Sequence, residues 1–384
     1  MSAASFVYVA TQDQLEDACN SMGNPIAIDT EFEWRKTYYP GASLYQFCSD
    51  GRTFLVDALV GLDLNRVRAL LASDGHTKIL HDMRQDWRLF TCLAEGPIRR
   101  CEDTRVASAF VGENSCIGYG EAVQVFLGVS VEKSQTTSKW LNRPLSTAQL
   151  QYAAEDVLHL TELWECLFGA MKDKGVDSWY REEMELLEGE LAAWDEELHF
   201  RIGGFKGLSV QQLNVLRSLC DWREGVARKR NLPRTWIVSD QELLAIAKMP
   251  SLERKRLEAV CSPQILRRYG TAILETVWIG LNAPEGLREV KATGRVSSQL
   301  VDRVRADLKS HLQQVAGDLG IAVDFLASRR TIAKCVNSLV LMEDVTREVT
   351  RWRWDLYGTE LRNALATQLE RRPEDNASSV RAAG

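Results

Sequence analysis

The chain contains 384 residues with a mass of 43.3 kDa, 45% of them hydrophobic and 26% charged, which is enough for two or three domains with well-packed cores. Its nine scattered cysteines are never spaced Cys-x-x-Cys, which argues against a disulfide scaffold and a structural zinc site and indicates a reducing cytoplasm. The first twenty residues resemble no secretory signal, and no apolar stretch approaches a membrane span, so we expect a soluble intracellular protein.

Charge is distributed unevenly along the chain. Residues 1–200 hold 17 basic and 32 acidic residues, residues 201–295 hold 17 and 9, and residues 296–384 hold 13 and 12. The acidic first part cannot simply bind a polyanion unless bound cations neutralise it, whereas the basic middle part could dock phosphates. A solvated helical surface is the alternative for the middle part, and the charge count does not separate the two.

The first 80 residues alternate between short β-branched or aromatic runs and stretches with helical spacing of apolar residues. This pattern predicts strands at 6–9, 26–31, 43–48 and 53–56 and helices at 12–22 and 64–72. It favours an α/β core. From Met83 onward helical patterns dominate, with a polar loop at 132–139. A capping box from Ser146 to Gln149 opens a helix that we expect to continue to about Met171.

The second half of the sequence is helical in pattern almost throughout. An acidic amphipathic stretch comes first, and prolines and the Gly203-Gly204 pair then divide the remainder. We expect a first domain at 1–175, an acidic helical linker at 176–205, two all-helical modules at 206–290 and 296–370, and a disordered tail at 371–384.

Two acids at the end of an apolar strand form the first of three unusual positions. Asp29 and Glu31 are two residues apart, so both carboxylates lie on one face of the strand and repel each other. A divalent cation such as Mg²⁺ would offset that repulsion, because hard cations prefer carboxylate oxygens. The alternative is a strand end that reaches solvent with two hydrated acids, and this pattern taken alone favours the alternative.

The second position lies where a short apolar strand, within residues 78–90, leads into a helix. Asp86 lies one turn into this helix, and Asp82 shares its face if the helix has already begun. Spacing leaves open which acid points inward. Asp82 also fits the role of an N-terminal acid that the helix dipole stabilises.

The third position is on the capped helix. Tyr152 and Asp156 are four residues apart and therefore share one helix face, while Ala153 and Ala154 permit close packing of neighbouring elements. A core tyrosine next to an ordinary surface aspartate would give the same pattern, and this reading is the simpler one for the pair alone.

In order and spacing, the three positions together resemble the exonuclease motifs of the DEDD superfamily, in its tyrosine-containing subgroup. The resemblance to the bacterial ribonuclease D family covers about residues 5–170 and implies a ribonuclease H-like α/β exonuclease domain. The matching motifs are Asp29-Thr-Glu-Phe32, Tyr39-Pro40, Leu44-Tyr-Gln46, His81 with Asp86, Asp103-Thr104, Lys133-Ser134, Trp140 to Leu145, and Tyr152 with Asp156.

This resemblance implies hydrolysis of nucleic acid from the 3′ end with two Mg²⁺ or Mn²⁺ ions. It assigns Asp29, Glu31 and Asp156 to the ion that generates the attacking hydroxide. Asp29 would also bridge to the second ion, which Asp86 binds directly or through water. Tyr152 would orient the attacking water, since the ordinary tyrosine pKa of about 10 makes this side chain a poor base at neutral pH.

Several side chains near these motifs are candidates for contacts with the substrate. The aromatic candidates for stacking on terminal bases are Phe32, Tyr38 and Tyr39, and the basic candidates for phosphates are Lys133, Lys139 and Arg143. Each has a plain alternative, because an aromatic residue beside a strand end is usually core and a lysine in a polar loop is usually hydrated. We retain Phe32, Lys133 and Arg143 as candidate substrate-binding residues.

The helical half carries its own resemblance. An amphipathic run at 213–234 ends in a cluster of basic residues, and an N-cap follows at Ser239 or Asp240. This run, through about residue 285, resembles the HRDC domain, a small helical bundle that binds nucleic acid, and 296–368 resembles a more divergent second copy. Arg228 and Arg230 are candidate RNA contacts. Trp352 and Trp354 fit packing before base stacking.

The combined resemblance implies a metal-dependent 3′–5′ exoribonuclease that releases nucleoside 5′-monophosphates. Its expected substrates are RNA 3′ ends, in particular those of transfer RNA precursors, and we expect a cytoplasmic monomer. A 3′–5′ DNA exonuclease is the alternative enzyme, because spacing reveals no contact to a 2′-hydroxyl. A catalytically silent RNA-binding scaffold is the alternative from another class, although all four acids and Tyr152 are present.

Overall fold

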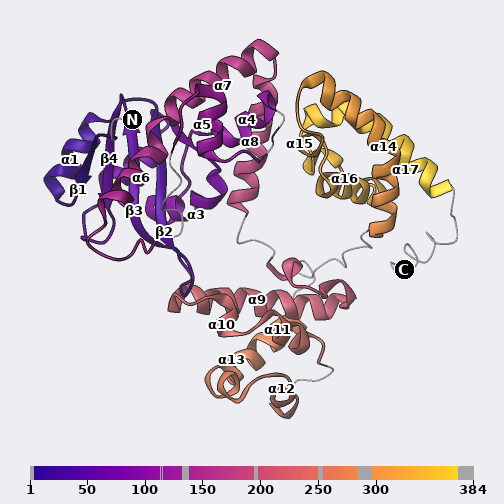
Figure 1. Cartoon of the computed structure of the whole chain (residues 1–384). Coiled ribbons are helices and arrows are strands. Elements are labelled where there is room, and N and C mark those ends of the chain that lie inside the picture. Colours follow the sequence, from indigo (N-terminus) through magenta and orange to yellow (C-terminus); the bar gives the residue numbers. More distant parts are fainter. Residues whose placement is uncertain are drawn as a thin grey trace. The chain divides into compact units, whose positions relative to one another are not determined.

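The computed structural model describes residues 4–112, 114, 116–131, 138–193, 198–249, 254–283 and 296–370. Most of the predicted loop at 132–139, including Lys133, lies outside these residues, as does the predicted tail at 371–384. The chain divides into two compact units (Figure 1). The first comprises Met1–Glu33, Gly41–Ala192 and Gly294–Gly384, and the second comprises Trp34–Pro40 and Ala193–Thr293.

A six-stranded mixed sheet forms the centre of the first unit, in the order β1-β4-β3-β2-β5-β6. The strands are β1 (Phe6–Val9), β2 (Ile26–Glu33), β3 (Gly41–Ser49), β4 (Arg52–Asp57), β5 (Lys78–Leu80) and β6 (Cys101–Asp103). β2, β3 and β4 are antiparallel neighbours, whereas β1 pairs with β4, β5 with β2, and β6 with β5 in parallel. The four strands predicted within residues 1–60 are confirmed.

Helices cover both faces of this sheet because both faces carry buried apolar side chains. The helices are α1 (Gln12–Ser21), α2 (Asn65–Ala72), α3 (Met83–Ala94), α4 (Thr104–Val111), α5 (Tyr119–Leu127), α6 (Thr147–Leu158), α7 (Leu160–Lys174) and α8 (Asp177–Ala192). Leu44 and Leu55 of the sheet pack against Ala153 and Ala154 of α6. The two small alanines let α6 approach closely and so bring its polar face next to β2.

The predicted long helix after Ser146 is two helices. Its capping box is confirmed, since the side chain of Ser146 accepts from the amide of Gln149 and the Gln149 side chain reaches back to the Ser146 amide. The helix stops at His159, which has φ −103° and ψ 3°. The His159 amide donates to the Tyr119 hydroxyl at 3.2 Å, so a distant side chain takes up a group that a continuous helix would pair internally.

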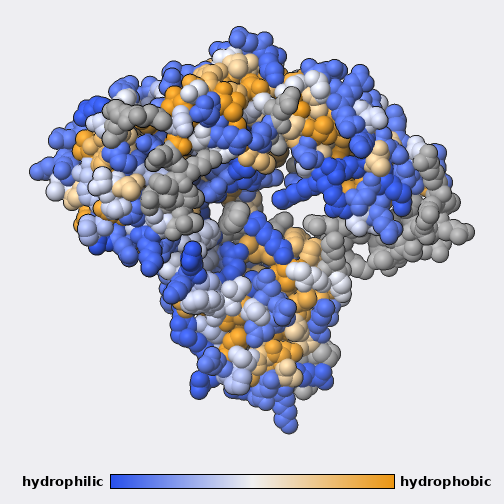
Figure 2. Space-filling view, viewed as in Figure 1, coloured by the Kyte–Doolittle hydropathy of each residue, from blue (hydrophilic) through white to orange (hydrophobic). Residues whose placement is uncertain are grey.

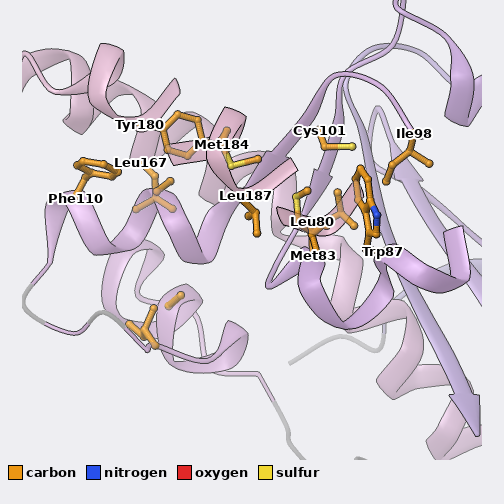
Figure 3. Close-up of a cluster of buried hydrophobic side chains, with 14 of the residues drawn as sticks. Leu80, Met83, Trp87, Ile98, Cys101, Phe110, Leu167, Tyr180, Met184 and Leu187 are labelled. Carbon is orange, nitrogen blue, oxygen red and sulfur yellow. The ribbon is translucent and has the colours of Figure 1, made fainter. Parts of the chain in front are cut away.

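The stretch predicted as an acidic linker contains α8, and one face of α8 belongs to the core of the first unit. Tyr180, Met184 and Leu187 are buried in the same cluster as Phe110 of α4 and Leu167 of α7 (Figure 3). The acidic residues of α8 occupy the remaining positions of the helix. Amphipathic spacing therefore docks this segment instead of leaving it as a spacer.

The C-terminal helical module also belongs to the first unit. It comprises α14 (Ser298–Leu319), α15 (Val323–Leu326), α16 (Arg329–Leu341) and α17 (Arg351–Glu370). Trp352 is buried and stacks on Trp179 of α8 with ring centroids 5.1 Å apart. Glu183 of α8 accepts from the Trp352 indole at 2.9 Å and from the Arg353 guanidinium. Trp352 therefore serves packing, as expected.

The second unit is a small helical bundle around α9. Its helices are α9 (Val210–Arg230), α10 (Arg234–Ile237), α11 (Asp240–Ala247), α12 (Arg254–Val260) and α13 (Pro263–Leu281). Of the two N-cap candidates for α11, Ser239 is the cap, in a capping box with Glu242. On the face shown in Figure 2, hydrophilic residues dominate the surface and hydrophobic ones are interspersed. Within the described part of the chain, no helix combines the length and apolarity needed to cross a membrane.

The segment between β2 and β3 is part of this second unit. Tyr38 is only 4% exposed there, and its hydroxyl donates to Glu224 and accepts from Nε of Arg228 at 2.9 Å. The side-chain oxygen of Asn231 accepts from the amides of Tyr38 and Tyr39 at 3.1 and 3.0 Å. The expectation that Tyr38 stacks on a substrate base is therefore wrong, because its ring is core material of the second unit.

Candidate active site

All five predicted catalytic side chains line one cavity of about 500 Å³ in the first unit. Asp29 and Glu31 come from β2, Asp86 from α3, and Tyr152 and Asp156 from α6. Both α3 and α6 lie beside β2 (Figure 1). Residues far apart in the sequence therefore converge at one place.

The register of the sheet positions the first pair of acids. Ile26, Ala27 and Ile28 are buried, and Asp29 and Glu31 follow on the strand. Across the antiparallel ladder, Asp29 pairs with Gln46 of β3. Gln46 is fully buried, and within the described residues neither polar atom of its amide has a hydrogen-bond partner. A buried polar side chain therefore lies beside Asp29 on the neighbouring strand.

The structure separates the roles of the two acids at the start of α3. Asp86 is 5% exposed and accepts a hydrogen bond from the hydroxyl of Thr30. Asp82 occupies the N-cap position with φ 62° but makes no side-chain cap, and its carboxylate pairs with Arg105 instead. Asp103 replaces it as the cap, accepting from the amides of Asp82 and Met83 at 3.1 and 2.8 Å. Both acids thus line the cavity, and Asp86 is the more deeply buried of the two.

Burial and mutual repulsion disfavour the charged forms of the cavity acids. Burial, followed by the charges of Asp86, Asp156 and Glu31, raises the pKa of Asp29 well above its ordinary value. Burial and then the charges of Asp156 and Asp86 raise the pKa of Glu31 to about 9. Burial raises the pKa values of Asp86 and Asp156 to about 7, although hydrogen bonds from Thr30 and Tyr152 respectively oppose it. Such a cluster is electrostatically suited to divalent cations.

The donor set fits hard cations in chemistry, but its side chains do not enclose an ion as they stand. In the described part of the chain, no three histidine, cysteine, aspartate or glutamate side chains are arranged to hold a metal ion. Asp86 and Asp156 face protein hydroxyl groups, those of Thr30 and Tyr152. The assignment of Asp29, Glu31, Asp86 and Asp156 as metal ligands therefore stays a prediction. Their shared cavity, their mutual repulsion and the unpaired Gln46 amide support it.

Other residues of the cavity wall were outside the predicted set. Tyr119 donates its hydroxyl to the Glu155 carbonyl at 2.8 Å and thereby supports the end of α6. His81 lies 3.1 Å from the Ile117 carbonyl through Nε2. That nitrogen must carry the proton, because a carbonyl only accepts. Burial lowers the pKa of His81 and favours this neutral form. No local pattern identifies Tyr119, because its partners lie 36 and 40 residues away.

Among the candidate substrate-binding residues, Phe32 lines the cavity and Arg143 does not. Nε and Nη2 of Arg143 donate to the two carboxylate oxygens of Asp57 at 2.7 and 2.6 Å. Its remaining hydrogens go to the carbonyls of Trp140, Asn142 and Ser43 at 2.9, 2.9 and 2.8 Å. All five donors of this guanidinium are therefore satisfied within the chain. The expectation that Arg143 contacts a phosphate is wrong for this arrangement.

The two remaining candidates lie on α9 of the second unit. Arg228 donates to the hydroxyl of Tyr38 at 2.9 Å, and Arg230 donates to the hydroxyl of Tyr269. Both side chains thus have protein partners and belong to a region with an excess of basic residues. Their contact with RNA stays a prediction.

Comparison with known proteins supports the exonuclease domain and the HRDC domain that the sequence predicts. Residues 6–171 match the family model of the 3′–5′ exonuclease, and residues 212–277 match that of the HRDC domain. The first match contains all five predicted catalytic residues of the cavity. The second match covers α9 to most of α13.

Relatives match the chain over most of its length. Ribonuclease D of Desulfotalea psychrophila is 31% identical over 320 residues, which cover 82% of this chain and 85% of the relative. Ribonuclease D of Escherichia coli K12 is 27% identical over 370 residues, covering 94% and 98%. The crystal structure of Escherichia coli RNase D, described as an exoribonuclease involved in structured RNA processing, superposes with a TM-score of 0.80 at 26% identity, covering 94% of this chain and 99% of that one. The chain belongs to the ribonuclease D family and is a 3′–5′ exoribonuclease.

Proposed function

We propose that this enzyme removes nucleotides from RNA 3′ ends in the cavity of the first unit, with divalent cations held by Asp29, Glu31, Asp86 and Asp156. The single observation that carries the proposal is the convergence of these four carboxylates on one cavity, where the charges of their neighbours raise the pKa values of Asp29 and Glu31. Divalent-metal dependence is general in this exonuclease family. The number of ions, two, and their identity, Mg²⁺ or Mn²⁺, belong to the proposal.

When bound, such ions would supply a nucleophilic hydroxide near neutral pH and neutralise charge on the scissile phosphate. Asp29 would hold both ions, Glu31 and Asp156 would complete the position next to the attacking water, and Asp86 would hold the leaving-group side. The hydroxyl of Tyr152 would orient that water, because it lies on the same helix face as Asp156 and hydrogen-bonds to it. Hydrolysis at the 3′ end then releases a nucleoside 5′-monophosphate.

Structured RNA, and transfer RNA precursors in particular, is the substrate class that we propose. The relative of known structure is described as acting in structured RNA processing, and the region 201–295 of this chain carries 17 basic against 9 acidic residues. A basic surface favours a polyanion by releasing its counterions. Monomeric state and a cytoplasmic location remain predictions from the sequence.

Asp29→Asn tests the proposal most directly. Release of labelled nucleotide from a 3′-end-labelled RNA is measured with Mn²⁺, with Mg²⁺ and with excess chelator. We expect the variant and the chelated wild type to release no measurable nucleotide, while circular dichroism and RNA binding stay unchanged. Asp17→Asn, at an exposed acid on α1, is the matched control and retains the wild-type rate. An active Asp29→Asn protein would refute the proposal.

A DNA oligonucleotide of the same sequence, labelled differently and added to the same reaction, separates RNA from DNA as substrate. Faster release from the RNA supports the assigned class. Equal or faster release from the DNA contradicts it, whatever the outcome for Asp29→Asn.

A further inference from the structure

Arg143, excluded above from the cavity lining, is the centre of a clamp of hydrogen bonds that is only partly exposed to solvent. It joins Asp57 at the end of β4 to the loop that precedes α6. Asp57 is 2% exposed and also accepts from the hydroxyl of Tyr8 and from the amide of Leu59. The carboxylate is therefore fixed on several sides, and so is the guanidinium that it holds.

The clamp fixes the backbone of Trp140 from two directions. The Trp140 carbonyl accepts from Nη1 of Arg143 at 2.9 Å and from the hydroxyl of Ser43 at 2.5 Å. Ser43 is itself fully buried on β3. Two donors on one carbonyl leave the peptide little freedom to rotate. The position of the Trp140 side chain is thus set by the strands beneath it.

The indole of Trp140 in turn lies against Tyr152. Their ring centroids are 6.2 Å apart at an interplanar angle of 38°, and Trp140 is only 2% exposed. Within the described residues, Nε1 of Trp140 has no hydrogen-bond partner. Because no polar contact from the described residues orients the indole, packing and the clamped carbonyl determine where it lies among them. The phenol ring of Tyr152 therefore packs against an indole whose position depends on the clamp.

We propose that Arg143 is a positioning residue for catalysis, which acts through Trp140 to hold the phenol of Tyr152 in the orientation that the reaction needs. This inference rests on the proposed role of Tyr152 in orienting the attacking water. Ser43 and Asp57 support the same chain of contacts from β3 and β4. A displacement of Tyr152 by a fraction of an ångström at this point changes the position of its hydroxyl relative to Asp156 and to the substrate.

A lysine at position 143 separates charge from geometry. Arg143→Lys keeps a positive charge near Asp57 but has no planar fork that could reach Asp57, Ser43 and the Trp140 carbonyl together. We expect kcat to fall about tenfold or more with KM changed by less than about threefold, because the orientation is lost and RNA binding is not. Circular dichroism and thermal denaturation check that the variant is folded. Arg329→Lys, at an exposed pair with Asp302, is the matched control and leaves kcat unchanged.

Combination with Tyr152→Phe distinguishes positioning from general destabilisation. If Arg143 acts through the phenol, Arg143→Lys lowers kcat by less than about twofold in the Tyr152→Phe background, where the hydroxyl is already gone. If the two losses multiply, or if Arg143→Lys changes only KM, the inference is overturned. A wild-type rate for Tyr152→Phe alone would overturn the proposed role of Tyr152, and with it this inference. If Tyr152→Phe lowers kcat and Arg143→Lys lowers it further by the same factor as in the wild type, the positioning role of Arg143 is overturned and the role of Tyr152 stands.

Substitutions of Trp140 and Ser43 keep the test decisive if Arg143→Lys does not fold. Trp140→Phe retains a ring against Tyr152, and its kcat is expected to stay within about threefold of the wild type. Trp140→Leu has no ring there, and its kcat is expected to fall as much as that of Arg143→Lys. Ser43→Ala removes one of the two donors to the Trp140 carbonyl and is expected to cause an intermediate loss. Equal kcat for Trp140→Leu and the wild type would overturn the inference.

Discussion

Asp57 and the cavity acid Asp86 are similarly inaccessible to solvent, at 2% and 5% exposed, yet their pKa values shift in opposite directions. Burial acts to raise the pKa of Asp57, but hydrogen bonds from Arg143, Tyr8 and Leu59 outweigh it and hold that pKa below its ordinary value. At Asp29 and Glu31, burial and neighbouring carboxylates act together and raise the pKa. The groups next to a buried carboxylate, and not the extent of its burial, therefore decide whether it stabilises the fold.

This contrast separates a structural acid from a functional one. The counterion of Asp57 is Arg143, a residue of the same chain. Among the described residues that line the cavity, Arg105 is the only permanently cationic side chain, and it is paired with Asp82. The remaining four acids have no internal counterion of that kind, so they suit cations that arrive from solution.

The largest expected effect is catalytic. Asp156→Asn removes one carboxylate of the cavity and should lower the single-turnover rate of nucleotide release by at least about a hundredfold, because the charge stabilisation that it provides is worth several kcal/mol. Glu165→Gln, at an exposed acid on the neighbouring helix α7, should leave this rate unchanged. If Asp156→Asn lowers the single-turnover rate by less than threefold, the distinction between the structural acid Asp57 and the functional acids of the cavity is contradicted.

Asp57→Asn should affect stability first. The change leaves Arg143 without its charge partner in a mostly buried site, so the free energy of unfolding at pH 7 should fall by about 1–3 kcal/mol. Urea denaturation measures this value. Asp302→Asn, at the exposed pair with Arg329, should change it too little to resolve. Equal effects in the two variants would show that burial adds nothing to the Asp57 pair.

The pH dependence of stability should reveal the repulsion in the cavity. Since the folded-state pKa values of Glu31, Asp86 and Asp156 are raised, the metal-free folded state binds more protons than the unfolded chain between about pH 4 and the raised values of about 7 to 9. The stability of the metal-free protein therefore falls as pH rises through this window. In chelator, we expect the melting temperature to drop by several degrees, on the order of 5 °C, from pH 5 to pH 8.

Two additions sharpen this measurement. Mn²⁺ or Mg²⁺ should restore the melting temperature at pH 8 more than at pH 5, because protons compete with metal for the carboxylates. Asp29→Asn should flatten the dependence in chelator. Stability that rises from pH 5 to pH 8 in chelator would contradict the raised pKa values.

The smallest expected effect concerns a single hydroxyl group on each side of the comparison. Thr30→Val removes the donor to Asp86, and Tyr8→Phe removes one donor to Asp57. Each should lower the free energy of unfolding at pH 8 by about 1 kcal/mol. Thr30→Val should lower the rate of nucleotide release by more than Tyr8→Phe, because the Tyr8 hydroxyl is linked to the active site only through Asp57 and the Arg143 clamp. An equal or larger loss of activity in Tyr8→Phe would contradict this order.

Local spacing placed the two β2 acids on one strand face and Tyr152 and Asp156 on one helix face, because both periodicities repeat within a few residues. Their assignment to one site needed the resemblance to the exonuclease motifs, since each pattern taken alone favoured a plain alternative. The choice between Asp82 and Asp86 depended on Asp103, which lies some twenty residues further along the chain. The role of Arg143 could not be read locally either. Its carboxylate partner, Asp57, is 86 residues away. The sequence does not show whether the guanidinium of an arginine is paired within the chain.

The helix break at His159 and the placement of Tyr38 escaped prediction for a related reason. The His159 amide pairs with a hydroxyl 40 residues earlier, and Tyr38 contacts residues nearly 190 positions later. Periodicity reports which face of an element is apolar, but not which distant element covers it. The metal ligands remain predicted because Asp86 and Asp156 accept hydrogen bonds from protein hydroxyl groups in the structure.

The position of residues 34–40 has a practical consequence for dissecting the enzyme. A truncation after residue 192 would strip Tyr38 of Glu224, Arg228 and Asn231 and expose its ring to water. Loss of activity in such a fragment would then not report on RNA binding by the HRDC region. Glu33 and Gly41 face each other in the β2–β3 ladder, so a two-residue Asn-Gly turn in place of residues 34–40 closes this hairpin and removes that cause of instability. The same truncation also removes α14–α17 from the core of the first unit, and that second loss needs its own control.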